Sequence, residues 1–452
     1  MADVTALARY RRALAKIGLP EADLDGRASL VADTIDGFRE QVGDEPAWVV
    51  WVPGRIEIFG KHTDYAGGRS LVAAVPRGFV LAGLPRGDAR VTAFDARWRQ
   101  GTEVDLTRDE PAPQGWANYI AVVARRLASN FPGAPLGTSI VFASDLPRAA
   151  GVSSSSALVV GVAGSLIRRA GLEQRPEWQA AIRDRLDLGG YLGAVENGLT
   201  FGSLAGTSGV GTHGGSEDHT AILNGQPDRV SAFSYVPVRS QGSAEMPAAW
   251  RFVIMPSGVE AAKAGAARGR YNAASLATRA LVDVWQRDHG AGAGQTLAAI
   301  LSSGPEAERA LRQALRTGAG EFTAAALDRR LSHFLAEDGR VPLALDAFAR
   351  ADAGALGALS ASSQADAERL LGNQIPPTSA LAALARESGA LGASSFGAGF
   401  GGSVWALIDE AGLATFPARW RAAYERQYPS LPRGESFVVR PAPAATELEL
   451  TD

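Results

Sequence analysis

The sequence predicts an α+β protein built of two domains. The chain has 452 residues, and a single hydrophobic core stops growing at about 250–300 residues. Strand-like segments gather in the first half, whereas an Ala- and Leu-rich helical region fills much of the second half. Strands that precede helices, without regular alternation, favour an α+β architecture over a βαβ series.

The first predicted domain covers residues 1–245. Its predicted helices and strands follow from apolar periodicity and β-branched runs. They are a helical segment at 5–42, strands at 47–52, 55–59 and 80–84, a helix at 116–129, a strand at 138–144, and helices at 156–170 and 176–197. The Gly-, Ser- and Thr-rich segment 198–215 is predicted to be a long loop, and such loops tend to be functional.

The second predicted domain covers residues 246–452. A polar stretch at 239–248, with Gly and Pro, separates it from the first domain and precedes a predicted strand at 250–255. Residues 271–387 are predicted to be mainly helical, and the apolar run 403–409 returns to a strand.

The composition excludes several classes of function. The chain is 46% hydrophobic and 21% charged with a net charge of −3, so it is an ordinary globular sequence without a nucleic-acid surface. It has no cysteine, which excludes disulfides, thiolate metal sites and a Cys nucleophile. No apolar stretch reaches membrane-spanning length, and the N-terminus does not resemble a secretory signal. We expect a cytoplasmic protein with no membrane partner and no obligate protein partner.

A glycine turn and four serines are the most informative local feature. The segment D-L-P-R-A-A-G-V-S-S-S-S-A-L-V-V-G-V-A at 145–163 leads from a predicted strand into a small-residue helix. Unpaired amides and the helix dipole at such a start favour anions, which predicts phosphate binding. An ordinary Ser-rich helix N-cap is the alternative interpretation.

Two familiar glycine motifs are rejected. The segment G-R-I-E-I-F-G-K-H at 54–62 has five residues between its glycines instead of the P-loop's four, and His62 stands where Ser or Thr should bind magnesium. Gly397, Gly399 and Gly402 satisfy G-x-G-x-x-G, but a strand-like segment follows where a Rossmann fold needs a helix.

Three segments in one order resemble the GHMP sugar and isoprenoid kinases. They are V-P-G-R-I-E-I-F-G-K-H-T-D-Y-A-G-G at 52–68, the serine turn, and F-G-A-G-F-G-G-S at 396–403. The first is similar to the galactokinase signature G-R-x-N-x-I-G-E-H-T-D-Y, and G-W-A-N-Y at 115–119 is also similar to a galactokinase segment. The resemblance implies a two-domain GHMP kinase fold with the active site in the cleft between the domains. It further implies transfer of the ATP γ-phosphoryl group to a sugar hydroxyl, usually at the anomeric carbon.

The resemblance also implies which residues bind ATP and Mg²⁺. Ser155 would supply a hydroxyl ligand to Mg²⁺ and Glu196 a second ligand, although a solvated carboxylate at a helix end is the alternative for Glu196. The third motif would bring backbone close to the phosphates and to the serine turn. The residues implied to bind the nucleotide are Gly151, Val152, Ser153, Ser154, Ser155, Ser156, Gly399 and Trp116, with Tyr119 beside the adenine; Trp116 and Tyr119 could equally be core residues.

The catalytic pair implied by the resemblance is Asp218 and Arg55. Asp218 would orient the attacking hydroxyl or accept its proton, and Arg55 would keep Asp218 ionised and stabilise the moving phosphoryl group. Glu217 is the neighbouring alternative, and we expect only one of the two carboxylates to face the substrate. Gly215 would bring its backbone close to the sugar.

The sugar site departs from the galactokinase pattern. Lys61 stands where galactokinases have the Glu that binds the C6 hydroxyl, while His62 and Asp64 are retained. Arg268 falls near the position of a sugar-contacting Tyr. One hypothesis is that Lys61 binds the carboxylate of a uronic acid. The other is that Lys61 donates to a hydroxyl of an ordinary hexose such as galactose.

Two other functions stay open at this point. The chain could be another GHMP small-molecule kinase, although the H-T-D-Y element argues against the branches that lack a polyol-binding set. It could also be a non-catalytic sugar- and ATP-binding regulator on the same fold. Retention of Arg55, Ser155 and Asp218 together favours an enzyme.

Overall fold

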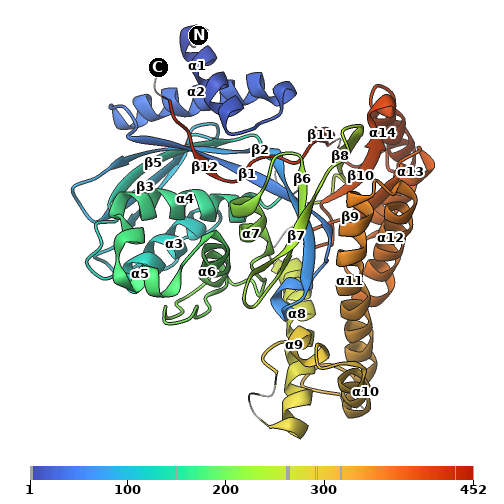
Figure 1. Ribbon diagram of the computed structural model, residues 1–452. Coiled ribbons are helices and arrows are strands. Elements are labelled where there is room, and N and C mark those ends of the chain that lie inside the picture. The colour runs from blue at the N-terminus through green and yellow to red at the C-terminus, as the bar shows by residue number, and fades with distance from the viewer. Residues whose placement is uncertain are drawn as a thin grey trace.

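The computed structural model describes residues 4–147, 150–260, 265–290, 292, 294–315, 318–432 and 434–450. At 265–268 it describes the backbone alone. The chain forms two sheets, each covered by helices, with a helical arm beside them (Figure 1).

The larger sheet has eight strands in the described ranges, along the path β12-β1-β2-β5-β3-β4, with β6 added to β2 and β7 to β6. Its strands are β1 (Trp48–Phe59), β2 (Arg69–Pro85), β3 (Arg90–Asp95), β4 (Gln100–Asp105), β5 (Thr138–Ser144), β6 (Arg229–Ser234), β7 (Arg239–Glu245) and β12 (Thr446–Glu447). The long β1–β2 pair is antiparallel, and its register shifts between Pro53 and Arg55. This irregularity lies directly before the Arg55 side chain.

Helices cover both faces of this sheet because successive strand residues point to opposite faces. Trp51 packs with α1 (Val4–Lys16) and α2 (Leu24–Val42), while its neighbour Val52 packs in the core that contains α3 and α4. The helices of the second face are α3 (Ala117–Asn130), α4 (Ser154–Ala170), α5 (Pro176–Ala181), α6 (Arg185–Asn197) and α7 (Glu217–Asn224).

The smaller sheet is antiparallel in the order β11-β8-β10-β9. It consists of β8 (Trp250–Pro256), β9 (Gly392–Ser395), β10 (Ser403–Asp409) and β11 (Phe437–Val439). Its helices are α12 (Ala353–Asp366), α13 (Pro376–Glu387) and α14 (Phe416–Gln427), and the arm contains α8 (Gly265–His289), α9 (Leu297–Leu301), α10 (Pro305–Ala314) and α11 (Ala324–Ala349).

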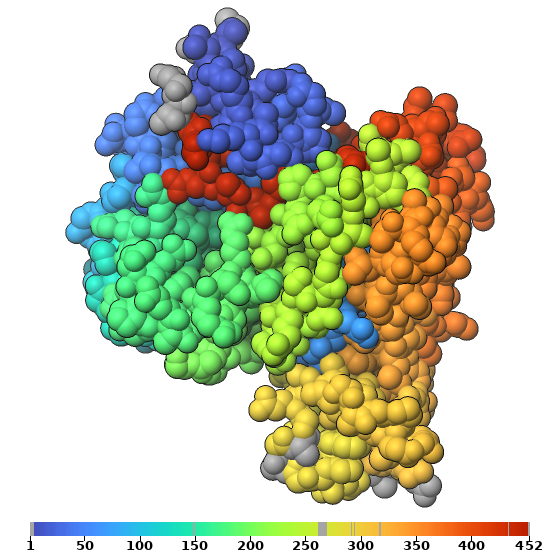
Figure 2. All heavy atoms as spheres, in the orientation of Figure 1, coloured from blue at the N-terminus to red at the C-terminus, as the bar shows by residue number. Residues whose placement is uncertain are grey.

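The end of the chain returns to the larger sheet. Strand β12 pairs with β1, and Leu448 packs in the core cluster formed by α1 and α2. Figure 2 shows this red segment lying between the blue N-terminal helices and the green helices. The predicted division after residue 245 falls between β7 of the larger sheet and β8 of the smaller one. Strand β12 follows this division in sequence but pairs in the larger sheet. The domain boundary therefore stays a prediction.

Most predicted elements are present, and several differ. The helical segment predicted at 5–42 consists of two helices, α1 and α2, and the polar stretch predicted to separate the domains at 239–248 contains strand β7. The strands predicted at 47–52 and 55–59 are one strand, β1, because the chain passes through Pro53 and Gly54 without leaving the sheet. The helix predicted at 176–197 is divided, since the Asp184 side chain accepts from two backbone amides and starts α6 anew. The polar hairpin of β3 and β4 was not predicted. The two rejected glycine motifs do lie in β1 and before β10, as their strand-like patterns predicted.

Candidate active site

Arg55 is the centre of a buried charged cluster. Its guanidinium donates to the Gly151 carbonyl oxygen at 2.7 Å and lies 2.5 Å from Asp218 Oδ1 and 3.3 Å from Glu217 Oε1. Burial lowers the pKa of this guanidinium, but the carboxylates of Asp218, Glu217 and Glu57 outweigh burial and raise the pKa above its usual value. Arg55 is therefore a permanent cation fixed among acids.

The two acids at the start of α7 both face Arg55. The expectation that only one of them would face the site is wrong, because adjacent residues in the first helical turn bring both carboxylates to the same guanidinium. The Glu217 side chain is 6% exposed and that of Asp218 is 17% exposed. Burial, followed by the charge of Glu57, raises the pKa of Glu217 well above its usual value. Asp218 is thus the more accessible carboxylate of the pair.

The serine turn begins α4 at the edge of this cluster. Ser153 has the left-handed φ of 61°, and Ser154 is the first residue of the helix. The Ser153 hydroxyl oxygen is buried and has no hydrogen-bond partner within the described ranges. An unsatisfied hydroxyl beside a helix N-terminus suits an anionic ligand.

The serine that faces Glu196 is Ser156 and not the predicted Ser155. The Ser156 hydroxyl donates to Glu196 Oε2 at 3.0 Å and lies 3.3 Å from Asp218 Oδ2. One residue along a helix turns a side chain by about 100°, which is why the two adjacent serines differ. Glu196 is buried, so its alternative interpretation as a solvated helix-end carboxylate is wrong. Nε2 of His219 also lies 2.9 Å from the same Glu196 oxygen.

The loop after β1 supplies His62 and Asp64. His62 Nε2 lies 3.2 Å from the Ala398 carbonyl oxygen, and Nδ1 lies 2.9 Å from the Tyr65 hydroxyl. A carbonyl only accepts, so Nε2 carries the proton and Nδ1 accepts from Tyr65. Both ring nitrogens are therefore held by protein groups, and the residue lines the pocket.

Asp64 is held against the loop that carries Gly215. Its Oδ2 accepts from the Glu217 backbone amide at 3.2 Å. A Cβ atom at Gly215 would lie 2.2 Å from the same oxygen, so glycine is required here for the close approach. Burial raises the pKa of Asp64 above its ordinary value. Gly215 thus allows the loop to pack directly against the Asp64 carboxylate, and its predicted contact with a sugar stays a prediction.

Tyr271 is the tyrosine that lines the pocket, three positions after Arg268, which was predicted to contact the sugar. Tyr271 lines the same pocket as Arg55 and Asp64, and its ring is 5.4 Å from that of His62. The Arg268 side chain lies outside the described residues. Tyr271 is three positions further along α8, or about one helical turn.

Lys61 does not line the pocket, so the structure supports neither hypothesis for this residue and both stay predictions. The Lys61 side chain is 0% exposed. Its ammonium donates to Ser363 Oγ at 2.7 Å and lies 3.8 Å from Glu337 Oε1. Although burial raises the pKa of Glu337, Lys61, His333, Arg340 and the Gly60 amide lower it to about 2. The charge that would bind a sugar carboxylate is therefore neutralised inside the protein.

Glu57 is a site residue that sequence reasoning missed. It lines the pocket two positions after Arg55 on β1. Alternate residues of a strand share a face, and this period could have identified it. Glu57 Oε2 accepts from the Gly397 amide at 3.3 Å. Burial raises the pKa of Glu57 to about 7 against the opposing charges of Lys61 and Arg55.

These side chains enclose a small pocket of about 40 Å³. Its lining residues are Arg55, Glu57, His62, Asp64, Tyr65, Glu217, Asp218, Tyr271, Gly397 and Ala398. The pocket is smaller than the roughly 300–1,000 Å³ of ordinary ligand sites.

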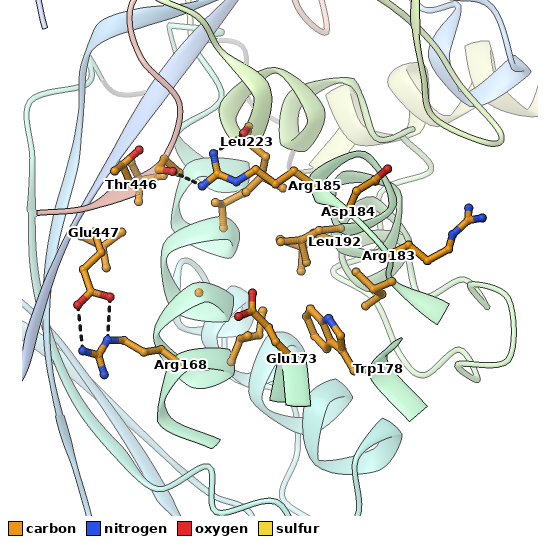
Figure 3. Close-up of a pocket in the computed structure, with 18 residues that line it drawn as sticks. Arg168, Glu173, Trp178, Arg183, Asp184, Arg185, Leu192, Leu223, Thr446 and Glu447 are labelled. Atoms are coloured by element: carbon orange, nitrogen blue, oxygen red, sulfur yellow. Dashed lines mark hydrogen bonds and ion pairs between the residues drawn. The ribbon is translucent and has the colours of Figure 1, made fainter. Parts of the chain in front are cut away.

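A second pocket, of about 410 Å³, is lined by residues that include Arg168, Trp178 and Glu447 (Figure 3). Leu192 of α6, Leu223 of α7 and Gly164 of α4 line it. It contains neither Arg55 nor Asp218, so we do not assign the active site to it despite its size.

The third glycine motif meets the serine turn directly. A Cβ atom at Gly397 would lie 3.3 Å from the Gly151 carbonyl oxygen. Gly399 instead packs against Asn373, where a Cβ atom would lie 2.3 Å from the carbonyl oxygen. The expected approach of the two motifs is therefore made by Gly397 and Gly151.

Trp116 is half-buried at the start of α3, 5.4 Å from the ring of Phe142. Trp116 and Tyr119 both pack against the main core, so their contact with adenine stays a prediction.

Among the described side chains, no group of three or more His, Cys, Asp or Glu has the geometry of a metal site. None of the described helices combines the length and the apolar character that a membrane span requires.

Three family signatures match the chain. Residues 36–85 match the galactokinase galactose-binding signature, 118–190 the GHMP kinases N terminal domain, and 344–426 the GHMP kinases C terminal. The chain is GHMP galactokinase-like. The family predicted from the three motifs is thereby confirmed.

Similar proteins include several galactokinases. That of Actinobacillus pleuropneumoniae serotype 5b is 35% identical over 128 residues, which are 28% of this chain and 33% of its own length. The match therefore spans about a third of that relative. The galactokinase of Exiguobacterium sibiricum is 25% identical over 408 residues, or 87% of this chain and 93% of its own.

The fold is shared with a solved galactokinase structure. The crystal structure of Lactococcus lactis galactokinase complexed with galactose has a TM-score of 0.75 and 22% identity, covering 92% of this chain and 100% of that chain. The predicted two-domain α+β GHMP kinase fold is confirmed.

Proposed function

We propose that this chain is an ATP-dependent sugar kinase that transfers the γ-phosphoryl group of ATP to the C1 hydroxyl of a monosaccharide. The observation that carries this proposal is the contact between Arg55 and Asp218 beside the N-terminus of α4. A cation, an acid and a helix N-terminus at one pocket are what phosphoryl transfer to a hydroxyl needs. The family signatures and the galactokinase relatives support the same activity.

In this proposal Asp218 acts on the acceptor hydroxyl. Its carboxylate is partly exposed to the pocket and is held by Arg55, so it can orient the hydroxyl and take its proton. The Arg55 guanidinium stabilises negative charge on the transferring group. Asp64 would accept hydrogen bonds from sugar hydroxyls, with Tyr271 and His62 forming the pocket wall.

The serine turn would hold the nucleotide phosphates through its amides and the Ser153 hydroxyl. ATP is the substrate that the family implies, and Mg²⁺ fits the residues present, since Ser156 and Glu196 offer oxygen ligands only. Ser156 and Glu196 would hold the ion, which would neutralise phosphate charge when bound. The domain boundary between β7 and β8 and a cytoplasmic location are part of the same proposal and stay predictions.

A kinase assay tests this proposal. Purified protein is incubated with ATP, Mg²⁺ and either galactose, arabinose, galacturonate or glucuronate, and sugar phosphate and ADP are quantified. We expect one neutral sugar to yield equal amounts of both products. Sugar-dependent melting shifts without any sugar phosphate would instead favour the regulator, and the absence of both effects would contradict the proposal.

A further inference from the structure

Glu57 places a carboxylate where the galactokinase signature quoted above has asparagine. Lys61 replaces the Glu of the same signature four positions later. Relative to that signature, this chain has its acidic residue at position 57 instead of position 61. Glu57 lines the candidate pocket, whereas Lys61 does not.

One oxygen of Glu57 lacks a partner. The residue is 3% exposed, its Oε2 accepts from the Gly397 amide, and its Oε1 has no hydrogen-bond partner among the described residues. A buried acceptor without a partner is costly, so a ligand that brings a donor to it is favoured. A sugar hydroxyl is such a donor, whereas a carboxylate is not.

The charge of the pocket points to the same class of ligand. Glu57, Asp64, Glu217 and Asp218 line it together with the single guanidinium of Arg55. The ammonium of Lys61 is covered by Ser363 and Glu337 and does not line the pocket. A sugar acid would add its carboxylate to four acidic side chains around one guanidinium, which like-charge repulsion disfavours.

We propose that Glu57 determines the choice of sugar: its Oε1 accepts a hydrogen bond from a hydroxyl of a neutral sugar, and its carboxylate excludes sugar acids. This inference rests on the proposed sugar kinase activity. It replaces Lys61 as the residue that distinguishes acids from neutral sugars.

The substitution Glu57→Gln tests the proposal. The amide oxygen of Gln can still accept from Gly397, while its NH₂ replaces the acceptor in the pocket by a donor. A hydrogen bond to a charged group corresponds to about a ten- to hundredfold change. We expect KM for the neutral sugar to rise by that factor and the preference for galacturonate over galactose to rise at least about tenfold. KM for ATP should not change.

Binding is measured beside turnover, by sugar-induced melting shifts. Glu173→Gln, at an exposed acid of the second pocket, is the matched control and should behave as wild type. If Glu57→Gln does not fold, Glu57→Asp keeps the charge and shortens the side chain. That variant should bind galactose more weakly and still reject galacturonate.

An unchanged galactose-to-galacturonate ratio in folded Glu57→Gln would overturn the role of Glu57. A wild type that binds a neutral sugar but transfers no phosphate would contradict the kinase activity and leave the binding test of Glu57 valid. A wild type that prefers galacturonate would overturn the inference alone.

Discussion

Lys61 and Glu337 form a fully buried ion pair between the sugar-signature loop and helix α11. Their charged atoms are 3.8 Å apart and both side chains are 0% exposed. Glu337 also accepts from the backbone amides of Gly60 and Lys61, at 3.0 and 3.3 Å. The pair therefore fixes the loop that carries His62 and Asp64 onto a helix that lies distant in sequence.

Removing one partner of this pair should be strongly destabilising. We expect Glu337→Ala to lower the free energy of unfolding by about 3–5 kcal/mol, since it leaves the ammonium of Lys61 buried without its acid. Urea denaturation measures this. The double variant Lys61→Met/Glu337→Leu removes both charges of the pair but leaves the Gly60 and Lys61 amides and Arg340 without their acceptor, so it should recover only part of the loss. A free energy of unfolding of Glu337→Ala within about 1 kcal/mol of wild type would contradict the buried pair.

Lys61→Met should leave sugar selection unchanged. Because the ammonium faces Ser363 and Glu337 and does not line the pocket, its removal should alter melting temperature but not the ratio of galactose to galacturonate turnover. A kinase assay with both sugars checks this. A shift of that ratio of about tenfold or more, or 1.4 kcal/mol, would restore the original hypothesis of charge matching.

The raised pKa of Glu57 predicts a pH-dependent difference in stability. Its pKa is about 7 in the folded chain against an ordinary 4.5, so the native state holds the proton more tightly. Its contribution to stability is complete below pH 4.5 and is lost as the pH rises through 7. Glu57→Gln removes this dependence.

We therefore expect the melting temperature of Glu57→Gln, relative to wild type, to be higher at about pH 8 than at about pH 5. Thermal melts of both proteins in matched buffers measure this difference. A constant difference across that range would show that Glu57 does not titrate there.

Gly164 of α4 offers a stabilising substitution. A Cβ atom there meets no atom within 4 Å, because Gly164 lines the second pocket. Gly164→Ala should raise the free energy of unfolding by about 1 kcal/mol through helix propensity. Gly161→Ala, one turn earlier, is the control: its Cβ would lie 2.5 Å from Leu81 Cδ1 and should destabilise the protein. Equal effects at both positions would contradict this packing.

Local patterns were sufficient to predict that Arg55 and Asp218 lie together, whereas their catalytic role stays a prediction, and they did not predict the surroundings of Lys61. Arg55 and Asp218 each lie in a short motif whose backbone geometry is set nearby, and the structure brings them together. The partner of Lys61 is Glu337 in the other half of the chain, and no local pattern connects the two. The buried contact between Lys61 and Glu337 therefore could not be predicted from the position of Lys61 in the signature.

Two other differences between the predicted and the observed site residues arise from the rotation of side chains along a helix and their alternation along a strand. Ser156 rather than Ser155 faces Glu196, and the exact start of α4 decides which serine does so. Glu57 shares a strand face with Arg55, and the alternation of β1 would have found it.

The central claim is that Asp218, held by Arg55, acts on the hydroxyl that receives the phosphoryl group. The most direct measurement is the single-turnover rate of Asp218→Asn with saturating ATP and the best neutral sugar. We expect this rate to be about 10²–10⁴-fold lower than that of wild type, with ATP binding retained. A rate within a few-fold of wild type would contradict it.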